Sequence, residues 1–200
     1  MPLARKPTTS DRSAYLQRDD VVDFGHPALT AQAAALRGAS DVETARRCFE
    51  FVRDQVEHSG DFRRSPTTCS ASEVLAARTG YCYAKSHLLV ALLRANGLPA
   101  GFCYQRLTVD GPAPPWCLHG LVAVELAGVG WYAIDPRGNR AGIAAAFDPP
   151  HERLAFPIEH EGERDFALIY PRPLREVLHC LRSYATWDEV RANLPDAERL

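Results

Sequence analysis

Cys82 stands at the beginning of a long apolar segment, where its chemistry differs from that of a core cysteine. The segment, GYCYAKSHLLVALLRANGLP at 80–99, starts with a glycine and ends at Gly-Leu-Pro, which predicts one helix that begins at Cys82 or Tyr83. The unpaired N–H groups and partial positive charge of a helix N-terminus favour a thiolate and can receive an oxyanion formed beside the sulfur. Cys82 is therefore a candidate nucleophile, although free cysteines more commonly close a buried core.

A nucleophilic cysteine needs a base and a group that orients the base, and the sequence offers one of each on neighbouring strands. His119 begins one predicted strand and Asp135 ends the next. The strands form a hairpin, so the two residues fall within about three positions in register and can meet across the pair. An aspartate that accepts from His119 would set its tautomer and stabilise the imidazolium. Each residue alone has a commoner structural role, but the combination with Cys82 is rare.

Three polar residues inside the predicted helix have weaker claims to a role. His87 follows Cys82 by five residues, about 140° round the axis, so it is interpreted as a surface or packing histidine. Lys85 and Ser86 lie nearer to the face of Cys82, and either support a site there or merely flank it. The base therefore has to come from outside this helix.

In the predicted order of elements along the chain, helices precede and follow three strands that form a meander. Capping boxes and apolar periodicity indicate the helices, and runs of aromatic and branched residues indicate the strands. The expected helices are a short one after Pro27, then 42–58, 70–78, the helix that begins at Cys82, 174–183 and 188–193; the expected strands are 101–109, 117–126 and 130–135. Residues 140–172 are expected to be mostly irregular, and 1–14 loose. This order predicts an α+β fold, with the helix of Cys82 packed against an antiparallel sheet.

Length and composition fit one domain over 1–200, with its core at about 40–140. Hydrophobic residues make up 46% of the 200 residues and charged residues 24%, which are ordinary globular values. The net charge of −2, without a lysine-rich face, argues against a nucleic-acid partner. No apolar run is long enough to span a membrane and no apolar signal segment begins the chain, so we predict a cytoplasmic protein without a membrane partner. Its six cysteines are then expected to be free thiols, and the oligomeric state stays open.

Three segments together resemble the core of the transglutaminase-like superfamily. They are GYCYAKSHLLVALLRANGLPAGFCYQRL at 80–107, LHGLVAVEL at 118–126 and GWYAIDPRGN at 130–139, within a match over about 70–139. The resemblance implies a papain-like fold with Cys82 as nucleophile, His119 as general base and acid, and Asp135 as the residue that orients the imidazole. It also implies acyl transfer from an amide bond through a thioester on Cys82, commonly to water. The expected substrate is a peptide or another amide, with no cofactor and no metal.

Two departures from the family pattern affect the expected pocket. His119 is followed by Gly120, where members often carry Ala-Trp, and 136–139 read PRGN, where members often have Pro-Thr. Gln105 is a candidate second oxyanion donor because it is an amide on the neighbouring strand, although a plain strand glutamine is the commoner reading. Aromatic side chains are expected to line or flank the cleft, with core packing as their commoner role: Tyr81, Tyr83, Tyr104, Trp116 and Trp131.

Other functions remain compatible with these residues. The chain gives no sign of a second domain to shield an acyl-enzyme from water, which favours hydrolysis, but protein-glutamine cross-linking stays an alternative. Arylamine N-acetyltransferases have similar triad spacing, yet would carry Arg-Gly-Gly-x-Cys where 78–82 read RTGYC. A zinc site would lack the usual short-spaced ligand pair; its ligands would be Cys82, Cys103, Cys117 and His119. A non-catalytic binding module with the same fold is a further alternative.

Overall fold

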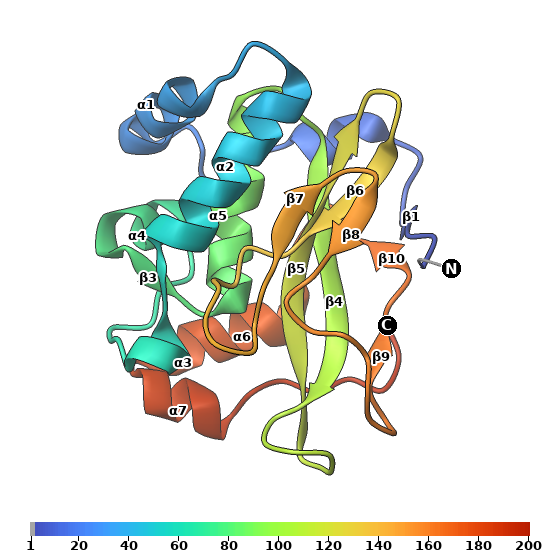
Figure 1. Ribbon diagram of the computed structural model, residues 1–200. Coiled ribbons are helices and arrows are strands. Elements are labelled where there is room, and N and C mark those ends of the chain that lie inside the picture. Colours follow the sequence, from blue (N-terminus) through green and yellow to red (C-terminus); the bar gives the residue numbers. More distant parts are fainter. Residues whose placement is uncertain (1–2) are drawn as a thin grey trace.

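A central helix organises the computed structural model, which describes residues 3–200. Helix α5 (Cys82–Ala95) is buried along almost its whole length, from Cys82 to Arg94. Its sequence is largely apolar, and a helix that is buried on all sides is stable only when other elements surround it. Helices α1 (Pro27–Leu36), α2 (Asp41–Gln55) and α4 (Ala71–Ala77) pack on one side of α5, and a sheet packs on the other (Figure 1).

The sheet is antiparallel and has the strand order β6-β5-β4-β9. Strands β4 (Ala100–Thr108), β5 (Trp116–Leu126) and β6 (Gly130–Ile134) form the predicted meander, and β9 (Arg164–Asp165) adds a short edge. One face packs on α5, and the other is covered near the N-terminus by Tyr15 of the 3₁₀ helix η1 (Arg12–Leu16). The predicted α+β fold, with the helix of Cys82 against an antiparallel sheet, is confirmed.

Local capping explains where the N-terminal helices begin. The Ser40 side chain accepts a hydrogen bond from the N–H of Glu43 at the start of α2. Ser70 and Glu73 form a complete capping box at the start of α4. Both motifs satisfy N–H groups that a helix cannot pair internally, so these starts could be predicted from the sequence.

The helix predicted over 42–58 ends earlier than expected, because the chain changes partner. Helix α2 ends at Gln55, and Glu57–His58 then forms strand β2, which pairs in parallel with strand β3 (Thr79–Gly80). His58 lies opposite Gly80 in this pairing, and a short helix, α3 (Ser59–Phe62), follows it. A pairing between segments about twenty residues apart leaves no periodic pattern in the sequence, so the prediction extended the helix.

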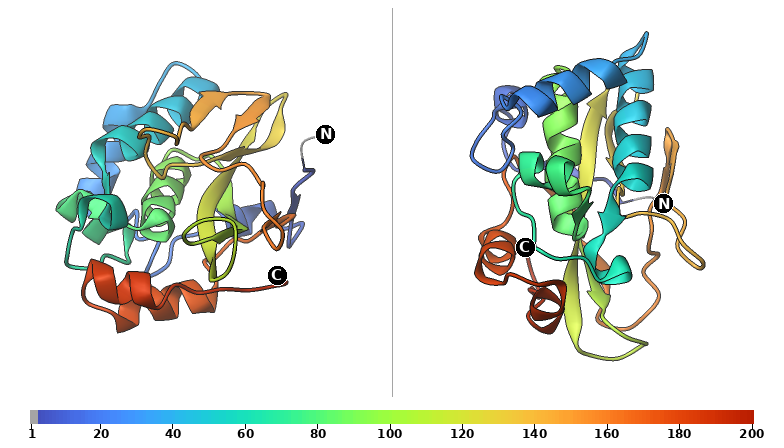
Figure 2. Two further views of the ribbon diagram at one scale, coloured as in Figure 1. Left: turned by 60° about the horizontal axis from the view of Figure 1, so that its bottom comes forward. Right: turned by 90° about the vertical axis from the view of Figure 1, so that its left-hand side faces the viewer.

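The segment expected to be mostly irregular contains only short strands. Strands β7 (Ala146–Asp148) and β8 (His151–Arg153) form a hairpin, and β10 (Leu168–Ile169) lies beside the N-terminal strand. The C-terminal helices α6 (Arg175–Ser183) and α7 (Trp187–Ala192) follow, close to their predicted positions. Figure 2 shows the two helices side by side at one end of the molecule.

The prediction that residues 1–14 are loose is wrong for the described part of that segment. Strand β1 (Lys6–Pro7) pairs in parallel with β10, and Arg5 forms ion pairs with Glu152 and Asp165. The polar composition of the segment concealed partners more than 140 residues away. Residues 1 and 2 lie outside the described residues. Among residues 3–200, the structure has no helix whose length and apolar character would allow it to cross a membrane.

Candidate active site

A cleft of about 480 Å³ lies where the beginning of α5 meets the beginning of β5. One wall comes from the sheet and includes Leu118 and His119, with Ala155 and Phe156 beside them. A second wall comes from β2, α3 and the loop after β6. The residues of this second wall are His58, Gly60, Asp61, Arg137 and Arg140.

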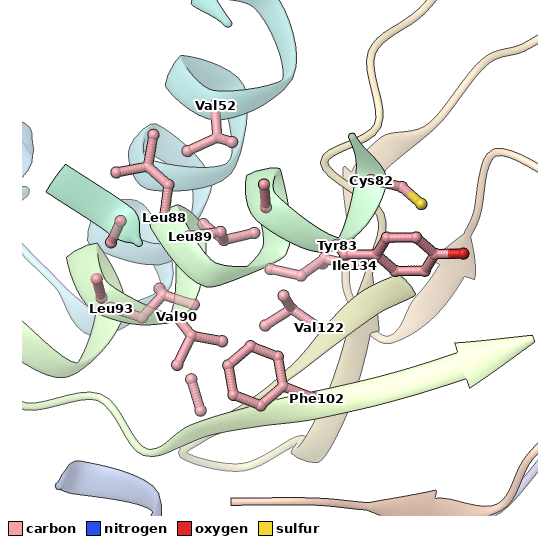
Figure 3. Close-up of a cluster of buried hydrophobic side chains, with 14 of the residues drawn as sticks. Val52, Cys82, Tyr83, Leu88, Leu89, Val90, Leu93, Phe102, Val122 and Ile134 are labelled. Atoms are coloured by element: carbon pink, nitrogen blue, oxygen red, sulfur yellow. The ribbon is translucent and has the colours of Figure 1, made fainter. Parts of the chain in front are cut away.

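Cys82 lies on the first turn of α5. It lines the cleft and is only 6% exposed. The residue before the helix, Tyr81, makes no capping hydrogen bond with its side chain, so it does not occupy the N–H groups of the first turn. Figure 3 shows Cys82 at one end of the apolar cluster that α5 forms with the sheet. Cys82 therefore belongs to the apolar cluster and at the same time lies at the polar N-terminus of a helix.

The structure joins His119 and Asp135 in the way that the hairpin register allows. Ile134 lies opposite Val122, so Asp135 falls beside Leu121, two positions from His119 on the same side of the strand. His119 Nε2 and Asp135 Oδ2 are 2.7 Å apart in a buried hydrogen bond. Because Nε2 faces the carboxylate, Nδ1 is the ring nitrogen left for Cys82.

Charge determines the protonation of His119. Burial lowers its pKa, but the charges of Asp135 and Cys82 and the hydrogen bonds to both groups raise it to about 10 overall. The ring also packs edge-on against Phe156, with the ring centroids 5.0 Å apart. The imidazole is therefore held in position and favours its protonated form beside Cys82.

Asp135 is fully buried, yet it is well supplied with hydrogen-bond donors. Its Oδ1 accepts from the backbone N–H of Arg137, and its Oδ2 accepts from the backbone N–H of Ala155 as well as from His119. Burial raises the pKa of this carboxyl, but the charge of His119 and these hydrogen bonds together lower it below its usual range. The carboxylate thus stays charged, because every contact it makes stabilises the anion.

The departure at Gly120 has a steric explanation. A Cβ at this position would lie 3.0 Å from Tyr83 Cδ1 and 3.3 Å from Tyr83 Cα. The hydroxyl of the buried Tyr83 donates to the backbone carbonyl of Leu118. Glycine after His119 therefore lets the first turn of α5 approach β5 closely, and Tyr83 ties the two elements together beside the candidate site.

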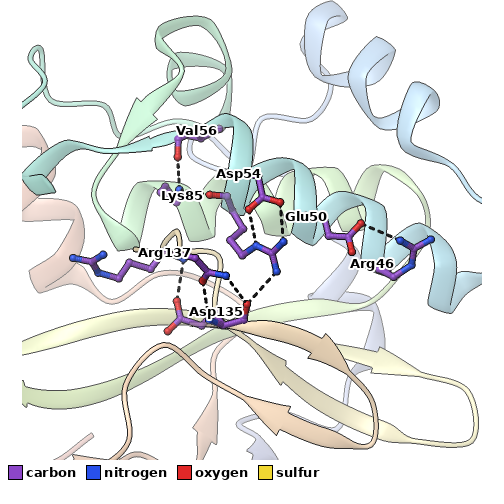
Figure 4. A network of polar contacts seen from close by, with 10 residues as sticks. Arg46, Glu50, Asp54, Val56, Lys85, Asp135 and Arg137 are labelled. Atoms are coloured by element: carbon purple, nitrogen blue, oxygen red, sulfur yellow. Dashed lines mark hydrogen bonds and ion pairs between the residues drawn. The ribbon is translucent and has the colours of Figure 1, made fainter. Parts of the chain in front are cut away.

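Lys85 does not line the cleft, and it supports the site through contacts with the end of α2. It is completely buried, and its ammonium donates to the carbonyls of Val56 and Arg53 at the end of α2 (Figure 4). Burial lowers the pKa of Lys85 to about 7, although the nearby charge of Asp135 opposes this effect. Ser86 donates to the carbonyl of Cys82 within the helix. The sequence left the roles of both residues open, and both bind backbone groups.

The other sequence-predicted residues are distributed differently. Tyr81 lines the cleft and its hydroxyl donates to the carbonyl of Trp187. Gln105 is directly opposite His119 in register, but its amide nitrogen donates to the carbonyl of Phe156 and it does not line the cleft. The structure therefore gives no support to Gln105 as an oxyanion donor. Trp116 stacks under Arg106, 4.3 Å from guanidinium carbon to ring centroid, outside the cleft.

Three further residues have packing roles. Tyr104 is buried and its hydroxyl accepts from the N–H of Leu174, while Trp131 packs against Tyr15. His87 is buried, with Nδ1 2.7 Å from the carbonyl of Cys69, and burial lowers its pKa to about 4. The structure thus agrees with the interpretation of His87 as a packing histidine.

The ligands imagined for zinc do not gather at one place. Cys103 packs with Tyr15 and Leu121 in a separate apolar cluster, away from the cleft that Cys82, Cys117 and His119 line. Within residues 3–200, no three His, Cys, Asp or Glu side chains are grouped so that they could hold a metal ion.

Sequence reasoning missed His58, which lines the same cleft as Cys82 and His119. It was placed at the end of the helix predicted over 42–58, and it lies in strand β2. The signal that could have identified it is the end of the helical apolar pattern at Val56, two residues earlier. That signal alone does not show which element His58 joins.

Comparison with known proteins places the chain in a family. The model of the transglutaminase-like superfamily matches residues 29–136, more than half of the chain. A candidate cysteine protease from Cytophaga hutchinsonii has a similar structure, with a TM-score of 0.51, 20% identity, and coverage of 68% of this chain and 46% of that one. The periplasmic domain of TgpA from Pseudomonas aeruginosa gives a TM-score of 0.48 and 20% identity, with coverage of 62% and 46%.

This chain thus spans less than half the length of those two structures. No curated protein matches its sequence. The similarity to the Cytophaga structure supports the fold, and the family model covers Cys82 and His119 and ends just after Asp135. On these grounds the chain belongs to the transglutaminase-like superfamily.

Proposed function

We propose that Cys82, His119 and Asp135 form a catalytic triad that transfers an acyl group from an amide bond, chiefly to water. The observation that carries the proposal is the cleft where Cys82, on the first turn of α5, meets a histidine whose far nitrogen is 2.7 Å from a buried carboxylate. A nucleophile, a base and an orienting group within one cleft are the parts that thiol acyl transfer requires. A peptide or another amide is the proposed substrate.

The reaction begins with the thiolate of Cys82 and the imidazolium of His119. The sulfur attacks the carbonyl carbon, and the π electrons move to the carbonyl oxygen. When that oxygen re-forms the double bond, the C–N bond breaks and His119 gives its proton to the departing amine. A thioester on Cys82 and a neutral His119 remain.

Water then completes the cycle through the same residues. His119 takes a proton from a water molecule as its oxygen attacks the thioester carbonyl. The C–S bond breaks, the acid product leaves, and the thiolate–imidazolium pair is restored. Asp135 stabilises the imidazolium in both half-reactions and keeps the ring oriented, which is consistent with the raised pKa of His119.

Selective alkylation tests the nucleophile directly. Brief treatment with iodoacetamide at pH 6.5, followed by peptide mapping, should modify Cys82 before any other cysteine. Burial raises the pKa of each of the other thiols, so they stay protonated at this pH: Cys48, Cys69, Cys103, Cys117 and Cys180. Equal modification of several cysteines, or none at Cys82, would contradict the proposal and favour a non-catalytic binding module.

Product analysis separates hydrolysis from transfer to an amine. The hydrolytic choice is supported by the similarity to a candidate cysteine protease. A panel of glutamine and peptide amides, with and without a primary amine, should yield mainly the free acid by mass spectrometry. Predominant amine incorporation would show a cross-linking enzyme instead. The cytoplasmic location and the single domain over 1–200 stay predictions.

A further inference from the structure

The imidazole of His58 is a buried polar group that the proposed triad does not use. His58 is 8% exposed, and its Nδ1 is buried without a hydrogen-bond partner among the described residues. The ring lines the cleft. Because Nδ1 is on the buried edge, the ring meets the cleft with its Nε2 edge. Its Nε2 also makes no hydrogen bond within residues 3–200 and is not among the buried unpaired atoms, so this nitrogen is free to bind a group in the cleft.

Backbone pairing fixes the position of His58 relative to the nucleophile. His58 is opposite Gly80 in the parallel pairing of β2 and β3, two residues before Cys82. Its ring packs edge-on against Tyr81, with centroids 5.4 Å apart, and close to Gly60. The ring is therefore held beside the backbone that precedes Cys82, and it lines the same cleft as His119.

The surroundings of His58 keep the ring neutral. Burial, followed by the charges of Arg137 and Lys85 and then of His119 and Arg140, holds its pKa well below the ordinary value. The nearest carboxylate, Asp61, is 3.8 Å from Nδ1, which is too far for a hydrogen bond.

Both oxygens of Asp61 are already bonded to Arg137, at 2.7 and 2.8 Å, and nothing fixes the imidazole proton on Nδ1 of His58. A neutral ring of this kind is a weak base and a poor acid, but it retains one N–H. It can therefore donate a hydrogen bond without giving up the proton.

We propose that His58 Nε2–H donates a hydrogen bond to the carbonyl oxygen of the bound substrate, as the second oxyanion donor beside the backbone N–H groups at Cys82. This inference rests on the proposed function. As the Cys82 sulfur adds to the carbonyl carbon, the electron pair moves to the oxygen, and the hydrogen bond from His58 strengthens with the charge. No proton is transferred from His58, and the bond weakens again when the C=O re-forms. Such donors act on the transition state more than on the bound substrate.

Two reagents separate this role from an effect on the thiol. p-Nitrophenyl acetate acylates a cysteine through a tetrahedral oxyanion, and the released p-nitrophenolate reports the rate. Iodoacetamide alkylates the same thiolate by displacement and forms no oxyanion. Each rate is measured for the full chain, with Cys82→Ala as the background and thermal unfolding as the check on the fold.

The variants are His58→Phe, which keeps a ring against Tyr81 but has no donor, and His58→Gln, which keeps an amide donor. His58→Leu is the second donor-free variant if the phenylalanine does not fit. We expect the donor-free variants to lose about a hundredfold in acylation, because removing one oxyanion donor costs on the order of 10²–10³ in rate. Alkylation should stay within about twofold of wild type, since iodoacetamide displacement forms no oxyanion. His58→Gln should recover part of the acylation rate.

Two outcomes would overturn the inference: wild-type acylation in the donor-free variants, or an equal fall in acylation and alkylation. The second would show that His58 acts on the thiolate or on the fold. Failure of wild-type Cys82 to react with either reagent would overturn the proposed triad instead, so the two proposals fail in distinguishable ways.

Discussion

The two walls of the cleft each carry a histidine near an aspartate, and the two histidines have opposite protonation. On the sheet wall, His119 is hydrogen-bonded to Asp135 and its pKa is raised to about 10. On the helical wall, His58 is 3.8 Å from Asp61 and its pKa is held well below the ordinary value. Both rings are buried, so burial cannot explain the difference.

The difference comes from the partners of the aspartates. Within residues 3–200, Asp135 accepts hydrogen bonds from His119 and from two backbone N–H groups and is bound by no guanidinium, so its negative charge acts strongly on the imidazole. Asp61 is bonded by both terminal nitrogens of the Arg137 guanidinium, with Arg140 nearby at 3.5 Å. These guanidinium groups neutralise most of the Asp61 charge, so little of it acts on the imidazole of His58. A histidine–aspartate pair therefore has no fixed chemistry, because a third residue decides whether the ring is charged.

Removing the thiol at the meeting point of the two walls should have the largest effect. Cys82→Ala is expected to abolish product formation, a loss of at least about 10⁴-fold, because the proposed thioester forms on the sulfur of Cys82. The thermal midpoint should move by only a few degrees, since a small side chain on a helix's first turn contributes little packing. Activity assays and thermal unfolding check both statements. Residual amidase activity above about 1% would mean that another residue is the nucleophile.

Replacing each aspartate by asparagine in turn tests which wall of the cleft controls the thiolate of Cys82. Asp135→Asn removes the charge that keeps His119 protonated, and we expect alkylation of Cys82 at pH 6.5 to fall by about a hundredfold, because a thiol of ordinary pKa, about 8.5, is only about 1% thiolate at that pH. Asp61→Asn is the matched variant on the other wall and should slow alkylation much less. Iodoacetamide kinetics with peptide mapping provide the measurement. Equal losses, or a larger loss with Asp61→Asn, would show that the helical wall controls the thiolate.

NMR titration of His119 and His58 tests directly whether the two imidazoles differ in protonation. In NMR spectra of the ring nitrogens, His119 should remain protonated from pH 6 to 8, while His58 should remain neutral. Cys82→Ala should lower the pKa of His119, because the charge of Cys82 is one of the contributions that raise it. A neutral His119 at pH 7 in the wild-type protein would refute the proposed ion pair.

The same shifts predict how the free energy of unfolding depends on pH. The raised pKa of His119 contributes stability that is complete below about 6.5, the unfolded value, and is lost as pH rises toward 10. The lowered pKa values of His58 and His87 contribute stability present above about 6.5 and lost as pH falls. Denaturant unfolding from pH 5 to 9 should give less stability at the acid end, whereas above pH 7 the lowered pKa of Lys85 opposes the loss from His119. His119→Gln should therefore make the free energy of unfolding rise more steeply with pH from 7 to 9, and an unchanged alkaline limb would contradict this assignment.

Adding a methyl group at Gly120, between α5 and the sheet wall, should have the smallest effect. Gly120→Ala places a Cβ 3.0 Å from Tyr83 Cδ1, and we expect a destabilisation of about 1–3 kcal/mol together with slower alkylation of Cys82. Gly128→Ala, at the β5–β6 turn, is the control: its φ of 76° makes alanine costly, but nothing lies within 4 Å of the new Cβ. The control should lower stability without slowing alkylation. Equal alkylation rates in both variants would show that the close approach of Tyr83 does not position the thiol.

The sequence by itself determined the elements that carry Cys82, His119 and Asp135. Helix caps, an apolar helix and a hairpin are local patterns, because residues a few positions apart satisfy each other's hydrogen bonds or share a face. The α+β class and the family followed from those patterns and from the segments that resemble it. The hairpin register limited His119 and Asp135 to neighbouring positions, and the structure then showed the hydrogen bond between them.

Only the tertiary structure decided what surrounds these residues. The pairing of β2 with β3 brought His58 to the cleft, and the bond from Arg137 to Asp61 joins residues 76 positions apart. The anchoring of Arg5 by Glu152, which contradicts the expectation of a loose N-terminus, spans 147 positions. Such contacts leave no periodic signal in the chain. The charge on an imidazole depends on its burial and on the nearest unneutralised charges, which exist only after distant segments have packed together.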